Sequence, residues 1–152
     1  MKALRNIITL AAIIALSLTA MTAKPEKQPD CKIHKVVFEV AIDGAEPWLG
    51  ALRNVENVQK TLGATTTTIK VVAHGKGIGM LLAKNADANP ELKATLEKLH
   101  ATGVVFAVCE NTMNKIQITK DQLVPLATTV DSGVSEVIRK QEAGYAYIKS
   151  GG

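Results

Sequence analysis

The sequence of 152 residues has few aromatic side chains and only two cysteines, and both shortages limit what the protein can be. Aromatic residues make up 3% of the chain and hydrophobic residues 47%, so we expect a core built mainly from aliphatic side chains. Two cysteines are too few for a small scaffold held together by disulfides. The length suits one domain with a single core and is too short for two ordinary domains.

The N-terminal segment, residues 1–23, has the layout of a secretory signal peptide. Lys2 and Arg5 provide its basic beginning, an uncharged apolar stretch follows, and small residues surround Ala20 and Ala23. We expect cleavage after Ala20 or Ala23, which predicts a periplasmic or secreted protein with no membrane attachment. The alternative is an uncleaved N-terminal anchor, although the uncharged stretch is slightly short for a membrane span.

The mature chain has no cluster of basic residues. Export would remove two of the 18 Lys and Arg residues and none of the 14 acidic ones, which reduces the net charge from +4 to about +2. No basic residues alternate with aromatic ones, so we predict that nucleic acid is not a partner. Residues 24–33 are a predicted polar lead-in, and residues 34–150 are a predicted single domain.

Strand and helix signals alternate along this domain. The apolar or β-branched segments that predict strands are residues 35–42, 65–73, 104–109, 126–130 and 145–148. The segments that predict helices are residues 47–62, 90–102 and 133–143, with capping signals at Asn89, Thr119 and Ser132. Such alternation predicts an α/β fold with a mainly parallel sheet and helices on both of its faces.

Two familiar kinds of catalytic site are missing from the sequence. No set of His, Cys and carboxylate residues has zinc-ligand spacing, and no Ser-His-Asp nucleophile elbow is present. We therefore predict neither a metal nor a cofactor. Trp48 and the leucine stripes are interpreted as core or interface residues in preference to a cofactor-binding surface. His34 and His100 are predicted to lie on the surface.

Cys109 is the first candidate site residue, because it ends the most apolar strand segment, GVVFAVC. Ligands and chemistry collect at the carboxyl ends of strands in open α/β sheets. A helix beginning just after Cys109 would lower the pKa of its thiol, whereas an inward-pointing Glu110 would oppose this. The thiol is therefore either reactive or, as is common for a cysteine in a buried strand, a small inert apolar group.

His74 is the second candidate, because it ends the preceding strand segment. Consecutive strands are often neighbours in such sheets, so His74 and Cys109 can lie side by side as a base and a nucleophile. Alternatively, His74 only orders the glycine loop that follows it. In that loop, Gly75, Lys76 and Gly77 could bind an anion, although their spacing fits neither the dinucleotide fingerprint nor the P-loop. The alternative for this loop is a flexible turn near the site.

Several stretches together resemble the DsrE/DsrF-like family, specifically its small exported members. They are KVVFEV, LRNVENV, KVVAHGKGIGML, GVVFAVCENTM and SGVSEVIRKQEAGYAYIKSG. The resemblance covers residues 34–150. It implies a three-layer α/β/α fold of flavodoxin-like architecture with a five-stranded parallel sheet, assembled as a trimer or hexamer. It also implies a role in sulfur relay, in which Cys109 matches the cysteine that carries sulfur as a persulfide and His74 matches the histidine of the glycine loop.

Two functions from different classes remain open at this stage. The first is a periplasmic sulfur carrier or sulfurtransferase-like protein, in which Cys109 accepts sulfur and exchanges it with a donor or acceptor partner. The second is a non-catalytic oligomeric module that binds a small molecule or an anion in a rim pocket. That pocket would combine His74 and Cys109 with Asn111, and Glu110 is a further candidate ligand-binding residue. The sequence also leaves open whether Cys31 and Cys109 form a disulfide.

Overall fold

The computed structural model describes residues 32–150. The predicted signal peptide and Cys31, with its possible disulfide, lie outside the described residues. The elements in chain order are β1 (His34–Val40), α1 (Ala45–Leu62), β2 (Thr67–Ala73), η1 (Gly75–Leu81), α2 (Ala83–Ala88), α3 (Pro90–Ala101), β3 (Val105–Cys109), α4 (Glu110–Lys115), η2 (Lys120–Gln122), β4 (Ala127–Val130), α5 (Gly133–Glu142) and β5 (Ala146–Ser150). The labels η1 and η2 denote 3-10 helices.

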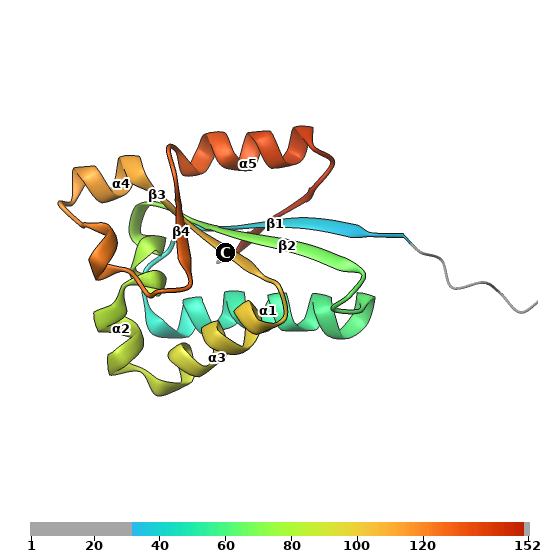
Figure 1. Cartoon of the computed structure of the whole chain (residues 1–152), viewed down its shortest axis with the longest axis horizontal. Coiled ribbons are helices and arrows are strands. Elements are labelled where there is room, and N and C mark those ends of the chain that lie inside the picture. The colour runs from blue at the N-terminus through green and yellow to red at the C-terminus, as the bar shows by residue number, and fades with distance from the viewer. Residues whose placement is uncertain (1–31, 151–152) are drawn as a thin grey trace, which may run out of the picture. The chain divides into compact units, whose positions relative to one another are not determined.

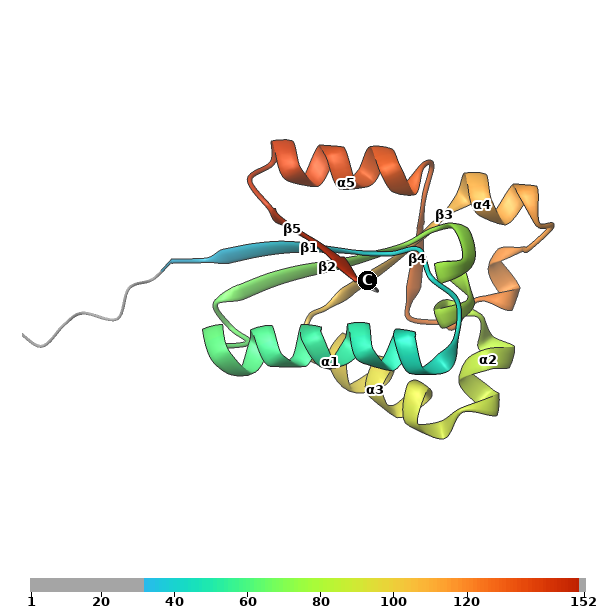
Figure 2. The same cartoon turned by 180° about the vertical axis from the view of Figure 1, so that it is seen from behind.

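The five strands form one parallel sheet in the order β4-β3-β2-β1-β5. Strands β1 to β4 are neighbours in chain order, whereas β5 returns to pair with β1 at the other edge (Figure 1). Helices α1 and α3 lie on one face of the sheet and α5 lies on the other, which both views show (Figures 1 and 2). This arrangement confirms the predicted three-layer α/β/α fold with a five-stranded parallel sheet.

The two faces of the sheet are packed very differently. On the face covered by α1 and α3, alternate residues of β1 (Val36, Phe38 and Val40) belong to a large apolar cluster. On the α5 face the apolar cluster contains only Val37, Val72 and Val137, with Tyr145 against it. Side chains alternate between the faces along each strand, so the order of residues in β1 to β3 decides which groups lie under α5.

The predicted capping residues perform their expected roles. The side chain of Asn89 accepts a hydrogen bond from the Leu92 N–H at the start of α3, and Ser132 caps α5 by accepting from the Ser135 N–H. Thr119 and Gln122 form the predicted capping box at η2. These bonds satisfy backbone N–H groups that have no partner within the helix itself.

The main differences from the sequence analysis lie after β2. The glycine loop is a 3-10 helix with five buried residues, not the flexible turn considered above. Its glycines are needed for packing: a Cβ on Gly77 would lie 2.0 Å from the Val40 carbonyl oxygen, and one on Gly79 would lie 2.6 Å from the Trp48 ring. Helix α2 (Ala83–Ala88) was not predicted. Within residues 32–150, none of the helices has the length and apolar character needed to cross a membrane.

Candidate functional site

Cys109 is the last residue of β3 and immediately precedes α4. Its side chain is on the α5 face of the sheet, and the residue is only 5% exposed. Cys109 is the one cysteine in residues 32–150, and its thiol has no disulfide partner among them. The near-continuous apolar strand that ends at this cysteine is thus a buried interior strand of a parallel sheet, as its composition indicates.

His74 lies beside Cys109. In the parallel pairing of β2 with β3, Ala73 is opposite Val108, so the next residue on each strand brings His74 and Cys109 together. Gly133, the first residue of α5, packs against both side chains. A Cβ on Gly133 would lie 2.9 Å from the His74 Cβ and 3.2 Å from the Cys109 Cβ. The structure therefore brings both candidate residues under the N-terminal end of α5.

Hydrogen-bond donors surround the sulfur atom of Cys109. Burial by itself raises the pKa of this thiol. The hydroxyl of Thr112 and the backbone N–H groups of Gly133, Thr112 and Asn111 lie around the sulfur, and their polar influence outweighs burial and lowers the Cys109 pKa below its ordinary value. These donors stabilise the thiolate, which is the nucleophilic form of cysteine, more than the thiol.

His74 has a carboxylate partner on the side away from β3. Its Nε2 atom lies 2.6 Å from Oε1 of Glu39, a residue of β1, and the two side chains are 19% and 17% exposed. The hydroxyl of Tyr147, on β5, donates to the other carboxylate oxygen of Glu39. A row of polar side chains thus crosses the sheet from the β5 edge to the thiol, in the order Tyr147, Glu39, His74 and Cys109.

Within this row of polar side chains, the pKa values of Glu39 and Tyr147 depart from their ordinary values. Burial raises the pKa of Glu39, but the hydrogen bonds from Tyr147 and His74 outweigh this effect, so the pKa lies below its ordinary value. The positive charge of Lys149 acts in the same direction as these bonds. The hydrogen bond to Glu39 raises the pKa of Tyr147 to about 12. The site therefore contains an ionised Glu39 beside a protonated Tyr147 at neutral pH.

Sequence reasoning missed both Glu39 and Tyr147. A glutamate inside the apolar stretch KVVFEV is a signal that could have identified Glu39, since a buried carboxylate needs a polar partner. Tyr147 is separated from Glu39 by 108 positions in the sequence, and their contact depends on β5 pairing with β1.

Of the three glycine-loop residues predicted to bind a ligand (Gly75, Lys76 and Gly77), only Gly75 forms a hydrogen bond with α4, the helix that begins directly after Cys109. The Gly75 N–H donates to the Thr112 hydroxyl oxygen at 3.1 Å, which ties η1 to the beginning of α4. Lys76 is exposed, and no hydrogen bond or ion pair joins it to any other residue between 32 and 150. Gly77 is buried against the Val40 carbonyl and belongs to the packing of the sheet.

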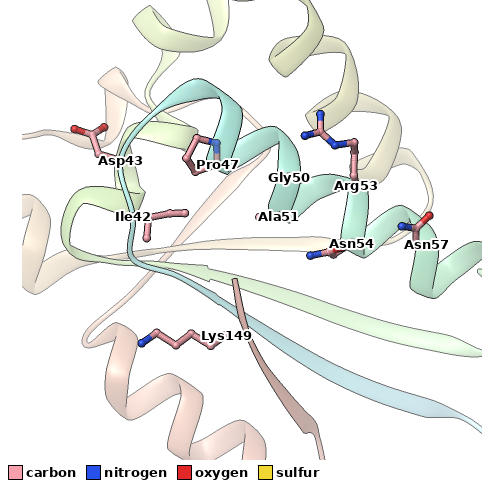
Figure 3. A pocket seen from close by; sticks show the side chains of 9 residues that line it. All are labelled: Ile42, Asp43, Pro47, Gly50, Ala51, Arg53, Asn54, Asn57 and Lys149. Atoms are coloured by element: carbon pink, nitrogen blue, oxygen red, sulfur yellow. The ribbon is translucent and has the colours of Figure 1, made fainter. Parts of the chain in front are cut away.

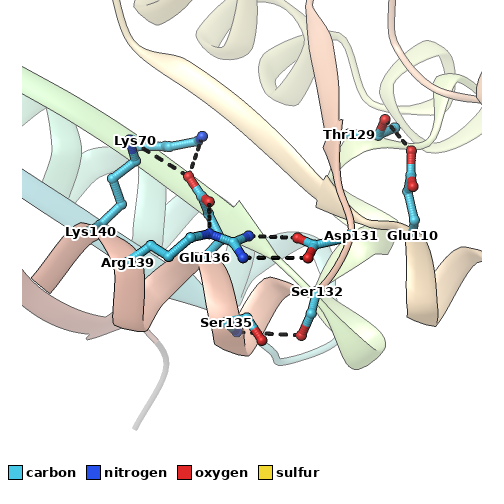
Figure 4. Close-up of polar contacts among 9 residues, drawn as sticks. All are labelled: Lys70, Glu110, Thr129, Asp131, Ser132, Ser135, Glu136, Arg139 and Lys140. Atoms are coloured by element: carbon cyan, nitrogen blue, oxygen red, sulfur yellow. Dashed lines mark hydrogen bonds and ion pairs between the residues drawn. The ribbon is translucent and has the colours of Figure 1, made fainter. Parts of the chain in front are cut away.

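Glu110 and Asn111 are both in the first turn of α4, and their side chains are not directed at the sulfur. The Glu110 carboxylate accepts a hydrogen bond from Thr129 at 2.6 Å (Figure 4). It also lies 3.0 Å from the Lys120 ammonium group. These partners lower the pKa of Glu110. Asn111 is exposed, and its backbone N–H donates to the Asp131 carbonyl oxygen at 3.2 Å.

Ion pairs hold α5 over the site. Lys70, on β2, lies 2.6 Å from Glu136, and Arg139 bonds both Glu136 and Asp131 (Figure 4). Burial raises the pKa of Glu136, but the bonds from Lys70 and Arg139 lower it overall. Because Asp131 and Glu136 flank the first turn of α5, this network fixes the position of Gly133 against His74 and Cys109.

A separate open cavity of about 860 Å³ lies beside the N-terminal half of α1 (Figure 3). Its cationic lining residues, Arg53 and Lys149, extend in different directions, and none of the predicted site residues lines it. No group of three or more His, Cys, Asp or Glu residues within 32–150 is arranged to hold a metal ion.

A family model and several solved structures match this chain. The model of the DsrE/DsrF-like family matches residues 14–150. The chain belongs to the DsrE/DsrF-like family. Its fold is similar to that of MTH1491, a protein of unknown function from Methanobacterium thermoautotrophicum, with 30% identity and a TM-score of 0.69 over 76% of this chain and 98% of that one.

The ychN protein from E. coli is a more distant structural match. It shares 13% identity with this chain, with a TM-score of 0.57 over 78% of this chain and 98% of that one, and this likeness concerns the fold alone. No curated protein matches the chain. Family membership and fold are thus established.

Proposed function

We propose that this DsrE/DsrF-like protein is an exported sulfur carrier that holds one sulfur atom as a persulfide on Cys109. The observation that carries the proposal is the set of donors around the sulfur, which lowers the pKa of the Cys109 thiol despite its burial. A stabilised thiolate is required for thiol–disulfide and thiol–persulfide exchange. The donors that favour a thiolate also favour the anionic terminal sulfur of a persulfide.

The reaction is an exchange at sulfur without net oxidation. The Cys109 thiolate attacks the sulfane sulfur of a donor R–S–SH; the donor S–S bond breaks, a Cys109–S–S bond forms, and RS⁻ leaves with the electron pair. His74, next to Cys109, takes the thiol proton and returns it to the leaving thiolate. The reverse sequence of steps, with an acceptor thiol, unloads the sulfur.

The burial of Cys109 restricts the donors that can react. The residue is 5% exposed and lies under the first turn of α5, so a narrow hydropersulfide or polysulfide anion suits the approach to sulfur better than a bulky disulfide. The predicted signal peptide supports a location in the periplasm or outside the cell. A homotrimer or homohexamer, together with a protein or small-molecule sulfur donor and acceptor, completes the proposal.

Intact-mass measurement tests the carrier function. The mature protein carrying Cys31→Ser is treated with polysulfide, and the expected adduct is about 32 Da, the mass of one sulfur atom gained by exchange. Reductant should remove this adduct, and Cys109→Ser should not form it. An unmodified wild-type mass, or the same adduct on the Cys109→Ser variant, would contradict the proposal.

The burial of the thiol favours a second candidate, a non-catalytic binding module of the same fold. In that case Cys109 lines a small rim pocket with His74 and the backbone of Asn111, and an anion or other small molecule is bound without covalent chemistry. Alkylation of the native protein separates the two functions. Slow labelling of Cys109 together with a thiol pKa at or above about 8.5 supports the binding module, whereas rapid labelling supports the carrier.

A further inference from the structure

We propose that Glu39 is a positioning residue that holds His74 in the Nε2–H tautomer and leaves Nδ1 as the proton acceptor for the Cys109 thiol. The inference rests on the proposed thiol function and adds to it a three-residue arrangement of Cys109, His74 and Glu39. Neither Glu39 nor Tyr147 is among the residues that the sequence suggested.

The first step concerns which ring nitrogen carries the proton. Glu39 is a carboxylate whose pKa lies below its ordinary range, and a carboxylate can only accept hydrogen bonds. Its Oε1 atom lies 2.6 Å from Nε2 of His74. The proton of this bond must therefore belong to Nε2, and a neutral His74 then has its lone pair on Nδ1.

The second step concerns how firmly Glu39 is held. Its Oε2 atom accepts the hydroxyl hydrogen of Tyr147, so the two carboxylate oxygens have different partners, from β2 on one side and β5 on the other. Lys149, the residue opposite Glu39 in the pairing of β1 with β5, adds a favourable charge. Because β2 and β5 flank β1, these contacts fix the carboxylate from both neighbouring strands.

The third step places the free nitrogen near the thiol. Nδ1 is bonded to Cγ of His74, and this Cγ lies 3.3 Å from the position of a Cβ on Gly133. The Cys109 Cβ lies 3.2 Å from the same point, so Gly133 packs against His74 and Cys109 together. Cγ carries both Nδ1 and Cδ2, so this end of the imidazole packs against Gly133 beside Cys109, while Nε2 at the other end of the ring lies 2.6 Å from Glu39 Oε1. Within residues 32–150 no hydrogen bond joins Nδ1 to the sulfur, and Nδ1 is the one ring nitrogen that Glu39 leaves available to the thiol.

This assignment gives each nitrogen one function. Nδ1 receives the proton of the Cys109 thiol as the thiolate attacks, and the resulting imidazolium is stabilised by the Glu39 carboxylate at Nε2. Nδ1 then returns the proton to the leaving thiolate, and the imidazole is neutral again. Without the carboxylate, the ring could adopt the Nδ1–H tautomer, which has no lone pair at the thiol end.

The test combines a tautomer measurement with a rate measurement on the mature protein carrying Cys31→Ser. Nitrogen-15 NMR of histidine-labelled protein at about pH 8, above the ordinary histidine pKa of about 6.5, reports which ring nitrogen of His74 bears the proton. His74→Asn assigns the signal among the three histidines of the chain. We expect the Nε2–H tautomer in the wild type and a mixture, or the Nδ1–H tautomer, in Glu39→Gln.

The rate of Cys109 alkylation is measured on the same samples across a range of pH. Glu39→Gln should lower the rate near neutral pH by about 10-fold, in the range typical of residues that orient a reacting group. Tyr147→Phe should have a smaller effect in the same direction. Glu46→Gln is the matched control, because this glutamate on α1 has a side chain that is 83% exposed, and neither measurement should change.

The outcomes separate the inference from the proposed function. An Nδ1–H tautomer or a doubly protonated ring at about pH 8 in the wild type would overturn the inference. An unchanged tautomer and rate in a folded Glu39→Gln variant would do the same. If the tautomer and rates follow the expectation but polysulfide forms no persulfide on Cys109, the positioning role stands and the sulfur-carrier function is wrong.

Discussion

The two faces of the sheet differ in composition: one is packed almost entirely with apolar side chains, and the other carries polar groups and the candidate site. The face under α1 and α3 is covered by a large apolar cluster that includes Phe38 and Phe106, both fully buried. The face under α5 has a small apolar cluster and two polar systems, the Lys70–Glu136 pair and the row that ends at Cys109. Because side chains alternate between the two faces along each strand, the same sheet carries the apolar core on one face and Cys109 with its polar neighbours on the other.

The largest expected effect is on the apolar face. Phe106→Ala removes a fully buried ring from β3 and should lower the free energy of unfolding by about 3–5 kcal/mol. Val105, its neighbour on the same strand, points to the other face and is 42% exposed. Val105→Ala is therefore the matched control, with an expected change within about 0.5 kcal/mol. Urea unfolding measures the free energy of unfolding of both variants, and an equal decrease in the two would contradict the assignment of Phe106 and Val105 to opposite faces.

The second effect concerns the ion pair beneath α5. Glu136→Leu leaves Lys70 without its partner in a largely buried position and should cost about 2–3 kcal/mol, less than for a fully buried pair. The double variant Lys70→Met with Glu136→Leu should recover most of this loss, because the largely buried lysine charge is removed together with its partner, and the other two partners of Glu136, Arg139 and Lys140, are more exposed. Denaturant unfolding provides the comparison. If the double variant is as unstable as Glu136→Leu, the loss does not come from the unpaired lysine.

A smaller stability effect, with a larger effect on chemistry, is expected at Gly133. A methyl group there would be only 2.9 Å from the His74 Cβ, so Gly133→Ala should cost about 1–3 kcal/mol through overpacking. It should also slow Cys109 alkylation: alanine keeps the backbone N–H, but the shift of α5 that relieves the overpacking would move this N–H away from the sulfur. Val134→Ala, at the exposed next position, is the control. An unchanged alkylation rate in Gly133→Ala would contradict the claim that the N-terminal end of α5 affects the reactivity of Cys109.

The smallest effect is the dependence of stability on acid. Glu39 and Glu136 have lowered pKa values in the folded protein, so below the ordinary glutamate value of about 4.3 the unfolded chain binds more protons than the folded one. Their contribution is therefore present above this pH and is lost as the pH falls further. Thermal unfolding should show a smaller decrease in Tm on acidification for Glu39→Gln than for the wild type. Parallel decreases would contradict the assigned role of Glu39.

The sequence predicts the architecture well because the relevant signals are local. Strand composition, the caps at Asn89 and Ser132, and the alternation of elements all depend on near neighbours in the chain. The position of Cys109 follows from the same signals, because the apolar segment that precedes it stops there. Its proximity to His74 follows once β2 and β3 are paired.

The parts that sequence reasoning did not reach depend on long-range pairing. Tyr147 meets Glu39 only because β5 returns to the β1 edge, and the strand order is not encoded in any local pattern. The close packing of Gly133 against His74 and Cys109 is likewise tertiary. The close packing of Gly77 against β1 and of Gly79 against Trp48 is also tertiary, and the anion site suggested by the glycine loop stays a prediction.

The central claim is that the α5 face stabilises a thiolate at Cys109. The most direct measurement is the pH dependence of Cys109 alkylation in the native protein carrying Cys31→Ser, compared with an unfolded sample. The account predicts a native thiol pKa below the ordinary value of about 8.5, together with an upward shift in Thr112→Val, which loses the hydroxyl donor. A native pKa at or above that of the unfolded chain would contradict it.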